Sequence, residues 1–124
     1  MVDTSNVFSG FSVDDLSAAK EFYGGVLGLD VLTNEGGFLE IRLPAGGYVL
    51  VYDKADHTPA SFTILNLAVA DIDVAVDELT ARGVEMQRYD GMPQDEKGIM
   101  RGNGPDIAWF TDPAGNVISV LVMG

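Results

Sequence analysis

Apolar residues along the chain follow two spacings, one typical of helices and the other typical of strands. The helical spacing, with apolar positions three and four residues apart, occurs over residues 16–27 and again over residues 72–82. Asp15 and Asp71 stand just before these stretches, where a short carboxylate can cap the free amides of the first turn. We therefore expect one helix after each aspartate, with one face of each helix packed on a sheet.

Strand patterns surround both predicted helices and repeat in the two halves of the chain. Runs rich in β-branched and aromatic residues cover residues 38–43 and 48–52, and then residues 107–111 and 117–122. A Pro-Ala-Gly turn separates the two runs in each half. One more strand is expected before each helix and another after the glycine that ends it, at Gly28 and Gly83. The sequence therefore predicts an α+β protein built from two βαβββ modules.

The 124 residues fit one domain of common size. We expect a single domain over residues 1–124, with module one over about residues 6–53 and module two over about residues 61–123. The segment of about residues 54–60 is polar and contains a proline, as is typical of a surface linker.

The net charge and the composition of the chain exclude several classes of binding partner and site. The formal net charge of −12 creates a field that repels phosphate backbones and anionic lipids, so we expect no nucleic acid and no membrane partner. Cysteine is absent, which excludes disulfides and thiolate metal sites. The first residues carry neither the basic nor the apolar region of a signal peptide, and we expect a cytoplasmic protein.

Four stretches of the sequence resemble the vicinal oxygen chelate superfamily, which includes glyoxalase I, the bleomycin and fosfomycin resistance proteins and the extradiol dioxygenases. They are Phe22-Tyr23 with Val26-Leu27-Gly28-Leu29, the stretch from Ala68 to Ile72, the stretch from Leu79 to Gly83, and the stretch from Trp109 to Asn116. The resemblance implies two βαβββ modules forming a concave sheet cavity, and a homodimer.

The resemblance also locates the positions at which metal-dependent relatives carry their ligands, on the first and last strand of each module. These positions hold Phe8, Leu50, Ile64 and Ser119, none of which is a histidine, glutamate or glutamine. We therefore expect no metal and no other cofactor. The single histidine, His57, lies in the linker, and we expect it at the surface, away from the cavity strands.

Side chains two apart on a strand share a face, and this parity selects the residues that would line the cavity. The predicted ligand-binding residues are Trp109, Asn66, Ser119, Phe8, Tyr48, Tyr52, Glu40 and Arg42. Apolar and aromatic walls with a few polar groups are typical of a small-molecule site. The alternative is that these side chains fill a closed core. Arg42 either grips an anionic ligand group or pairs with Glu40 at the cavity mouth.

The sequence leaves two further alternatives open. The segment of residues 94–104 is either a lid that folds over the cavity, with Lys97 and Arg101 as its cations, or a polar hairpin. For function, we expect metal-independent binding or sequestration of a small hydrophobic or aromatic ligand. The alternative is a lyase or dioxygenase-type enzyme with an atypical site, whose catalytic residues are unknown. A third possibility is a structural or regulatory protein with a vestigial cavity.

Overall fold

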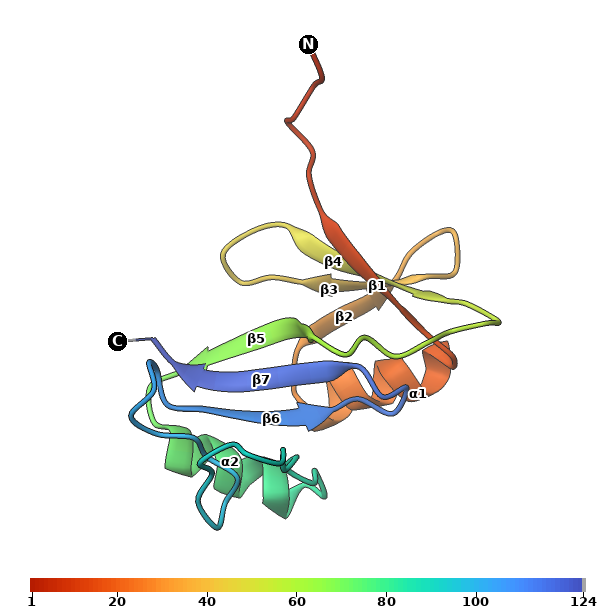
Figure 1. Cartoon of the computed structure of the whole chain (residues 1–124). Helices are drawn as coiled ribbons and strands as arrows, with labels where there is room; N and C mark the ends of the chain where they lie inside the picture. The colour runs from red at the N-terminus through yellow and green to blue at the C-terminus, as the bar shows by residue number, and fades with distance from the viewer. Residues whose placement is uncertain (124) are drawn as a thin grey trace. The chain divides into compact units, whose positions relative to one another are not determined.

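The computed structural model describes residues 1–123, which divide into two compact units, one from Met1 to Pro59 and the other from Ala60 onward (Figure 1). The first unit contains β1 (Ser9–Val13), α1 (Leu16–Lys20), the π-helical segment η1 (Glu21–Val26), β2 (Asp30–Thr33), β3 (Leu39–Arg42) and β4 (Tyr48–Asp53). The second unit contains β5 (Thr63–Val69), α2 (Ile72–Ala81), β6 (Ile107–Thr111) and β7 (Val117–Val122).

The sheet of the first unit has the strand order β1-β4-β3-β2, in which only the β1–β4 pair is parallel. Alternate strand residues are buried together with Ala19 of α1 and Tyr23 of η1, and the Tyr23 ring lies 5.6 Å from that of Phe11. The buried strand residues are Phe11, Val13, Leu39, Ile41, Val49 and Val51. We call the opposite side the open face of the first sheet.

The first helix begins where the sequence predicts. Asp15 caps it by accepting a hydrogen bond from the amide of Ala18 at 3.0 Å. From Glu21 the helix widens into η1, which ends at Val26, and Gly28 just beyond it takes a left-handed conformation with a φ of 74°. The predicted helix over residues 16–27 is therefore confirmed, with a π-helical second half that the apolar spacing did not reveal.

The sheet of the second unit has the order β5-β7-β6, with β5–β7 parallel and β6–β7 antiparallel. Asp71 caps α2 through the amide of Val74 at 3.1 Å. The helix buries one stripe together with one side of the sheet, where it packs against the central strand β7. The buried residues are Ile72, Val76, Leu79, Ala108, Phe110, Ile118 and Val120. The side away from α2 is the open face of the second sheet. Over residues 1–123, no helix is long and apolar enough to cross a membrane.

The predicted α+β fold of two modules is confirmed, but one strand of the second module is missing from the described residues. No regular strand lies between α2 and β6 in the described chain, and residues 84–89 contact the sheet through a hydrogen bond from the Gln87 amide to the Trp109 carbonyl at 2.8 Å. The chain then turns away at Tyr89. Met100 exchanges backbone hydrogen bonds with Ile107 instead, so the edge of β6 is shared between two short segments.

Candidate ligand-binding site

Three of the predicted site residues form a row across the second sheet. Asn66 on β5 is in register with Ser119 on β7, and Ser119 is in register with Trp109 on β6. The Ser119 hydroxyl is fully buried and donates a hydrogen bond to the Asn66 side-chain carbonyl at 2.5 Å. Asn66 itself is exposed and Trp109 is half-buried. The row places one indole surface and one amide on the same open face.

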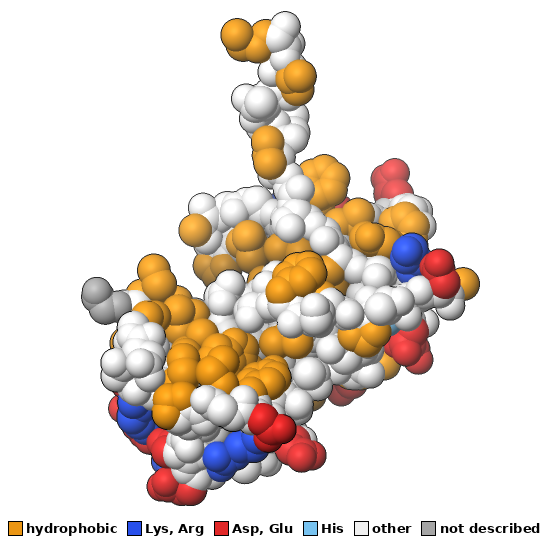
Figure 2. Space-filling view, in the orientation of Figure 1, with side chains coloured by type: hydrophobic (Ala, Val, Ile, Leu, Met, Phe, Trp, Pro, Cys, Tyr) orange, Lys and Arg blue, Asp and Glu red, His pale blue; other side chains and the backbone are white. Residues whose placement is uncertain are grey.

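The row lies among apolar side chains. The neighbouring cross-strand row consists of Ala68, Leu121 and Ile107, in the same register and on the same face. Figure 2 shows hydrophobic side chains gathered over the strands of the second unit, with charged side chains along the margin. An apolar surface with a small number of polar groups is the usual composition of a small-molecule site.

Tyr89 is a further member of this surface that the sequence did not indicate. Its ring lies 5.6 Å from the Trp109 ring, centroid to centroid, with the planes at 82°. Residue Tyr89 is 37% exposed. Partial burial of its phenol raises the pKa of that group. The feature of the sequence that could have indicated Tyr89 is an aromatic residue within a polar loop segment of the second module. That signal is weak, because exposed aromatic residues are common in loops.

The open face of the first sheet carries a separate aromatic and charged group. The Phe8 ring stacks on the Tyr48 ring at 4.8 Å and 19°, and the Arg42 guanidinium lies 5.9 Å from the Tyr48 ring centre. Arg42 forms an ion pair with Glu40 at 3.0 Å. Of the two roles considered for Arg42, the ion pair with Glu40 is therefore the one present. Tyr52 is on the same face, in register with Ser12.

His57 differs from the expectation. We expected a surface histidine away from the cavity strands, but it is only partly exposed, and its Nδ1 forms a hydrogen bond with the Ser12 hydroxyl of β1 at 2.7 Å. The linker returns to the sheet because the Lys54 amide donates to the Val13 carbonyl and the His57 amide donates to the Lys54 carbonyl. A tight turn thus brings the imidazole back beside β1.

The residues at the metal-equivalent positions do not fit a metal. Phe8, Leu50 and Ile64 have hydrocarbon side chains, and the Ser119 hydroxyl is already bonded to Asn66. A divalent cation needs several imidazole, carboxylate or comparable donors at close range. Throughout residues 1–123, no group of three or more His, Asp or Glu side chains is arranged to hold a metal.

The long loop of the second module folds as a hairpin against α2. A tight turn joins Asp95 to Ile99, whose side chain is fully buried. Lys97 forms ion pairs with Asp73 and Asp77 of α2, the latter at 3.1 Å. The predicted polar hairpin is thus present, and these contacts hold it on the helix side of the sheet rather than over the open face.

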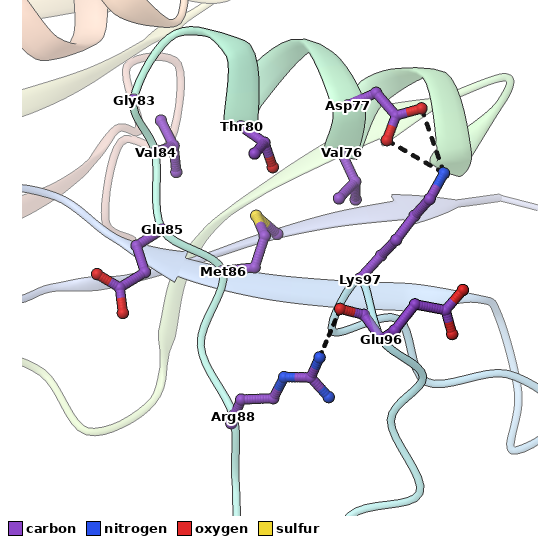
Figure 3. Close-up of a pocket in the computed structure, with 10 residues that line it drawn as sticks. All are labelled: Val76, Asp77, Thr80, Gly83, Val84, Glu85, Met86, Arg88, Glu96 and Lys97. Carbon is purple, nitrogen blue, oxygen red and sulfur yellow. Dashed lines mark hydrogen bonds and ion pairs between the residues drawn. The ribbon is translucent and has the colours of Figure 1, made fainter.

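A cavity of about 460 Å³ lies between this hairpin and α2, on the helix side (Figure 3). Its walls include Val76 and Thr80 of α2 and Met86 of the following segment. The cations around it already have partners: Lys97 reaches Asp77, and Arg88 donates to the Glu96 carbonyl at 2.6 Å. Because the cavity lies on the helix side of the sheet, it is separate from the row of Asn66, Ser119 and Trp109 on the open face. It can therefore be compared with that row in ligand tests.

Comparisons with known proteins agree with the resemblance seen in the sequence. The family model of the Glyoxalase/Bleomycin resistance protein/Dioxygenase superfamily matches residues 7–120. No curated protein matches the sequence significantly.

Among solved structures, TnmS3, described as an antibiotic binding protein from Streptomyces sp. CB03234, is similar at 25% identity and a TM-score of 0.70, covering 100% of this chain and 99% of that chain. A superfamily member from Sphaerobacter thermophilus DSM 20745 is 24% identical, with a TM-score of 0.73 and coverage of 98% of both chains. A glyoxalase/bleomycin resistance protein from Streptomyces sp. CB03234 is 28% identical, with a TM-score of 0.63, covering 94% of this chain and 99% of that chain. Because the family match extends over nearly the whole sequence, this chain belongs to the Glyoxalase/Bleomycin resistance protein/Dioxygenase superfamily.

Proposed function

We propose that the chain is a metal-independent binding protein that sequesters a small planar aromatic compound on the open face of the second sheet. The row of Asn66, Ser119 and Trp109 is the observation that carries this proposal. Trp109 supplies a broad stacking surface, and Asn66 supplies a polar anchor beside it. The first-sheet residues Phe8, Tyr48, Tyr52, Glu40 and Arg42 remain predicted ligand contacts.

The hydrogen bond between Ser119 and Asn66 determines which polar group of Asn66 is presented to a ligand. Its carbonyl oxygen accepts the Ser119 hydroxyl, which leaves the amide nitrogen as the donor at this exposed position. The apolar neighbours Ala68, Leu121 and Ile107 provide no competing polar group around it. The expected ligand therefore combines a flat hydrocarbon-rich ring system with an acceptor atom near its edge.

Charge gives a second property of the ligand. The chain carries a formal net charge of −12, so its field attracts cations and repels anions. A neutral or cationic aromatic compound therefore suits the protein better than an anionic one. The similarity to TnmS3, described as an antibiotic binding protein, supports small-molecule binding as the class of function. The donor set at the metal-equivalent positions argues against a metal-dependent enzyme at the usual site, so the alternative of a lyase or dioxygenase-type enzyme would need an atypical site.

The test is a titration with two planar probes, cationic 9-aminoacridine and neutral acridone. Because Trp109 is the single tryptophan, its emission reports the site directly. We expect saturable quenching by both probes. Acridone, whose carbonyl is an acceptor, tests the donor of Asn66, whereas the cation has no acceptor and tests stacking and charge, so its binding should be tighter at low salt. Trp109→Leu, followed by probe fluorescence, should weaken binding roughly tenfold through loss of the stacking surface.

Thr80→Ala is the matched control, because Thr80 lines the cavity on the helix side. It should leave the affinity of both probes unchanged. Binding that is insensitive to Trp109→Leu but weakened by Thr80→Ala would move the site to that cavity and overturn the proposal.

A further inference from the structure

We infer that Tyr89 is a second aromatic contact for the ligand and that Gln94 is the residue that positions it. This inference rests on the proposed function, because it adds a second wall to the same surface. It assigns a role to the loop that follows α2. In the first module, the segment that corresponds to this loop is the short strand β2.

The two rings form a corner. Their planes stand at 82° with centroids 5.6 Å apart, so a flat ring stacked parallel to Trp109 presents its edge to Tyr89. Both offset stacking and edge-to-face contacts are favourable arrangements for aromatic groups. Burial raises the pKa of the Tyr89 phenol, which therefore stays protonated at neutral pH and can donate to an acceptor atom at the ligand's edge.

The Gln94 side chain holds the segment that carries Tyr89. Its Oε1 accepts a hydrogen bond from the Tyr89 amide at 2.8 Å. Its Nε2 donates to the carbonyls of Gln87 and Gly98, each at 2.9 Å. One amide thus joins both ends of residues 87–89 to the hairpin. Since Gln87 is also bonded to the Trp109 carbonyl, the arrangement fixes Tyr89 relative to β6.

Other contacts around the hairpin do not set the ring directly. Arg88 donates to the Glu96 carbonyl, and Lys97 reaches across to α2, as Figure 3 shows. These contacts anchor the hairpin to the body of the unit. The Met92 amide donates to the Tyr89 carbonyl at 3.1 Å within the backbone turn, and Gln94 is the residue whose side chain bonds the Tyr89 backbone among the contacts described. Gln94 therefore acts on the ligand surface through Tyr89.

The experiment measures 9-aminoacridine affinity in the full chain and in four variants. Tyr89→Ala should weaken binding by roughly threefold to tenfold, and Tyr89→Phe should retain most of the affinity because the ring remains. Gln94→Ala should weaken binding to a similar extent. The double variant carrying Tyr89→Ala and Gln94→Ala should bind no more weakly than Tyr89→Ala alone, because Gln94 acts through Tyr89.

The matched control is Gln87→Ala, which removes the same kind of side chain while keeping the backbone groups that bond Trp109 and Gln94. Its affinity should equal that of the unaltered chain. Near-ultraviolet circular dichroism adds a second readout: Gln94→Ala should change the Trp109 bands, and Gln87→Ala should not.

The outcomes separate this inference from the proposed function. If the unaltered chain binds neither probe, both fail. If it binds through Trp109 but Tyr89→Ala keeps full affinity, only the role of Tyr89 is overturned. If the double variant loses affinity additively, Gln94 has a structural effect of its own and its assignment as the positioning residue is wrong.

Discussion

The Ser119 hydroxyl donates a hydrogen bond to the Asn66 side-chain carbonyl at 2.5 Å, across the parallel pair of β5 and β7. By resemblance to metal-dependent relatives, position 119 is where a metal ligand would stand. Here the side chain instead orients a neighbouring amide. A hydrogen bond thus stands at position 119 in place of a metal ligand, and it sets the orientation of the Asn66 amide on the open face.

Ser119→Ala should free the Asn66 amide to rotate and so weaken acridone binding, by roughly threefold, through loss of one oriented hydrogen bond. The cost to the free energy of unfolding should be about 1 kcal/mol, since one buried bond is lost. Titration of Trp109 emission and urea denaturation measure the two effects. Thr111→Val, on the same face, is the control, and an equal loss of affinity in it would show that Ser119 has no special role.

Asn116→Ala should destabilise the second unit without changing the ligand surface. Asn116 is 2% exposed; its backbone and side-chain nitrogens donate to the Asp112 carboxylate, and its side-chain carbonyl accepts from the Ala60 amide at 3.1 Å. The substitution removes the side-chain hydrogen bond to the Asp112 carboxylate and the one from the Ala60 amide, both at a buried residue, at a cost of about 1–3 kcal/mol, while the backbone amide at position 116 still donates to Asp112.

Urea denaturation of Asn116→Ala should show this loss, while 9-aminoacridine affinity in the folded protein stays unchanged. Unchanged stability would contradict the structural role assigned to the Asp-Pro-Ala-Gly-Asn turn.

The ion pairs between the hairpin and Asp73 of α2 should be lost in acid. The hydrogen bond from Arg101 lowers the pKa of Asp73 below its ordinary value of 3.8. Because the folded pKa is depressed, the stabilisation is present above the unfolded pKa and is lost as the pH falls through the lower folded pKa.

Carbon-13 NMR titration of the Asp73 carboxyl should therefore give a midpoint below 3.8. Arg101→Gln, or high salt, should return the midpoint toward the ordinary value. A midpoint that is the same in the unaltered chain and in Arg101→Gln would exclude the ion pair in solution.

Much of the fold was predictable because local signals determine it. Asp15 and Asp71 mark both helix starts, and the period of two along a strand identifies which side chains of β6 and β7 share a face. The register confirms that Asn66, Ser119 and Trp109 lie on one face, as parity predicted. Their part in ligand binding stays a prediction.

The features that the sequence did not reveal depend on contacts between distant residues. Tyr89 lies beside Trp109 in a loop segment whose backbone is bonded by the Gln94 side chain of the following hairpin. His57 returns to Ser12 through a linker turn whose hydrogen bonds leave no periodic signature. The missing strand after Gly83 has a related cause, since the edge of β6 is divided between Gln87 and Met100.

Two-dimensional proton–nitrogen NMR of the labelled chain during titration with acridone shows directly whether a ligand binds at the row of Asn66, Ser119 and Trp109. The indole N–H of the single tryptophan gives one resolved signal at position 109. We predict that this signal and the side-chain amide of Asn66 show the largest ring-current shifts, and that both saturate with the same dissociation constant. The largest shifts at Val76, Thr80 and Met86, with the Trp109 signal unmoved, would place the ligand in the cavity beside α2 and contradict the account.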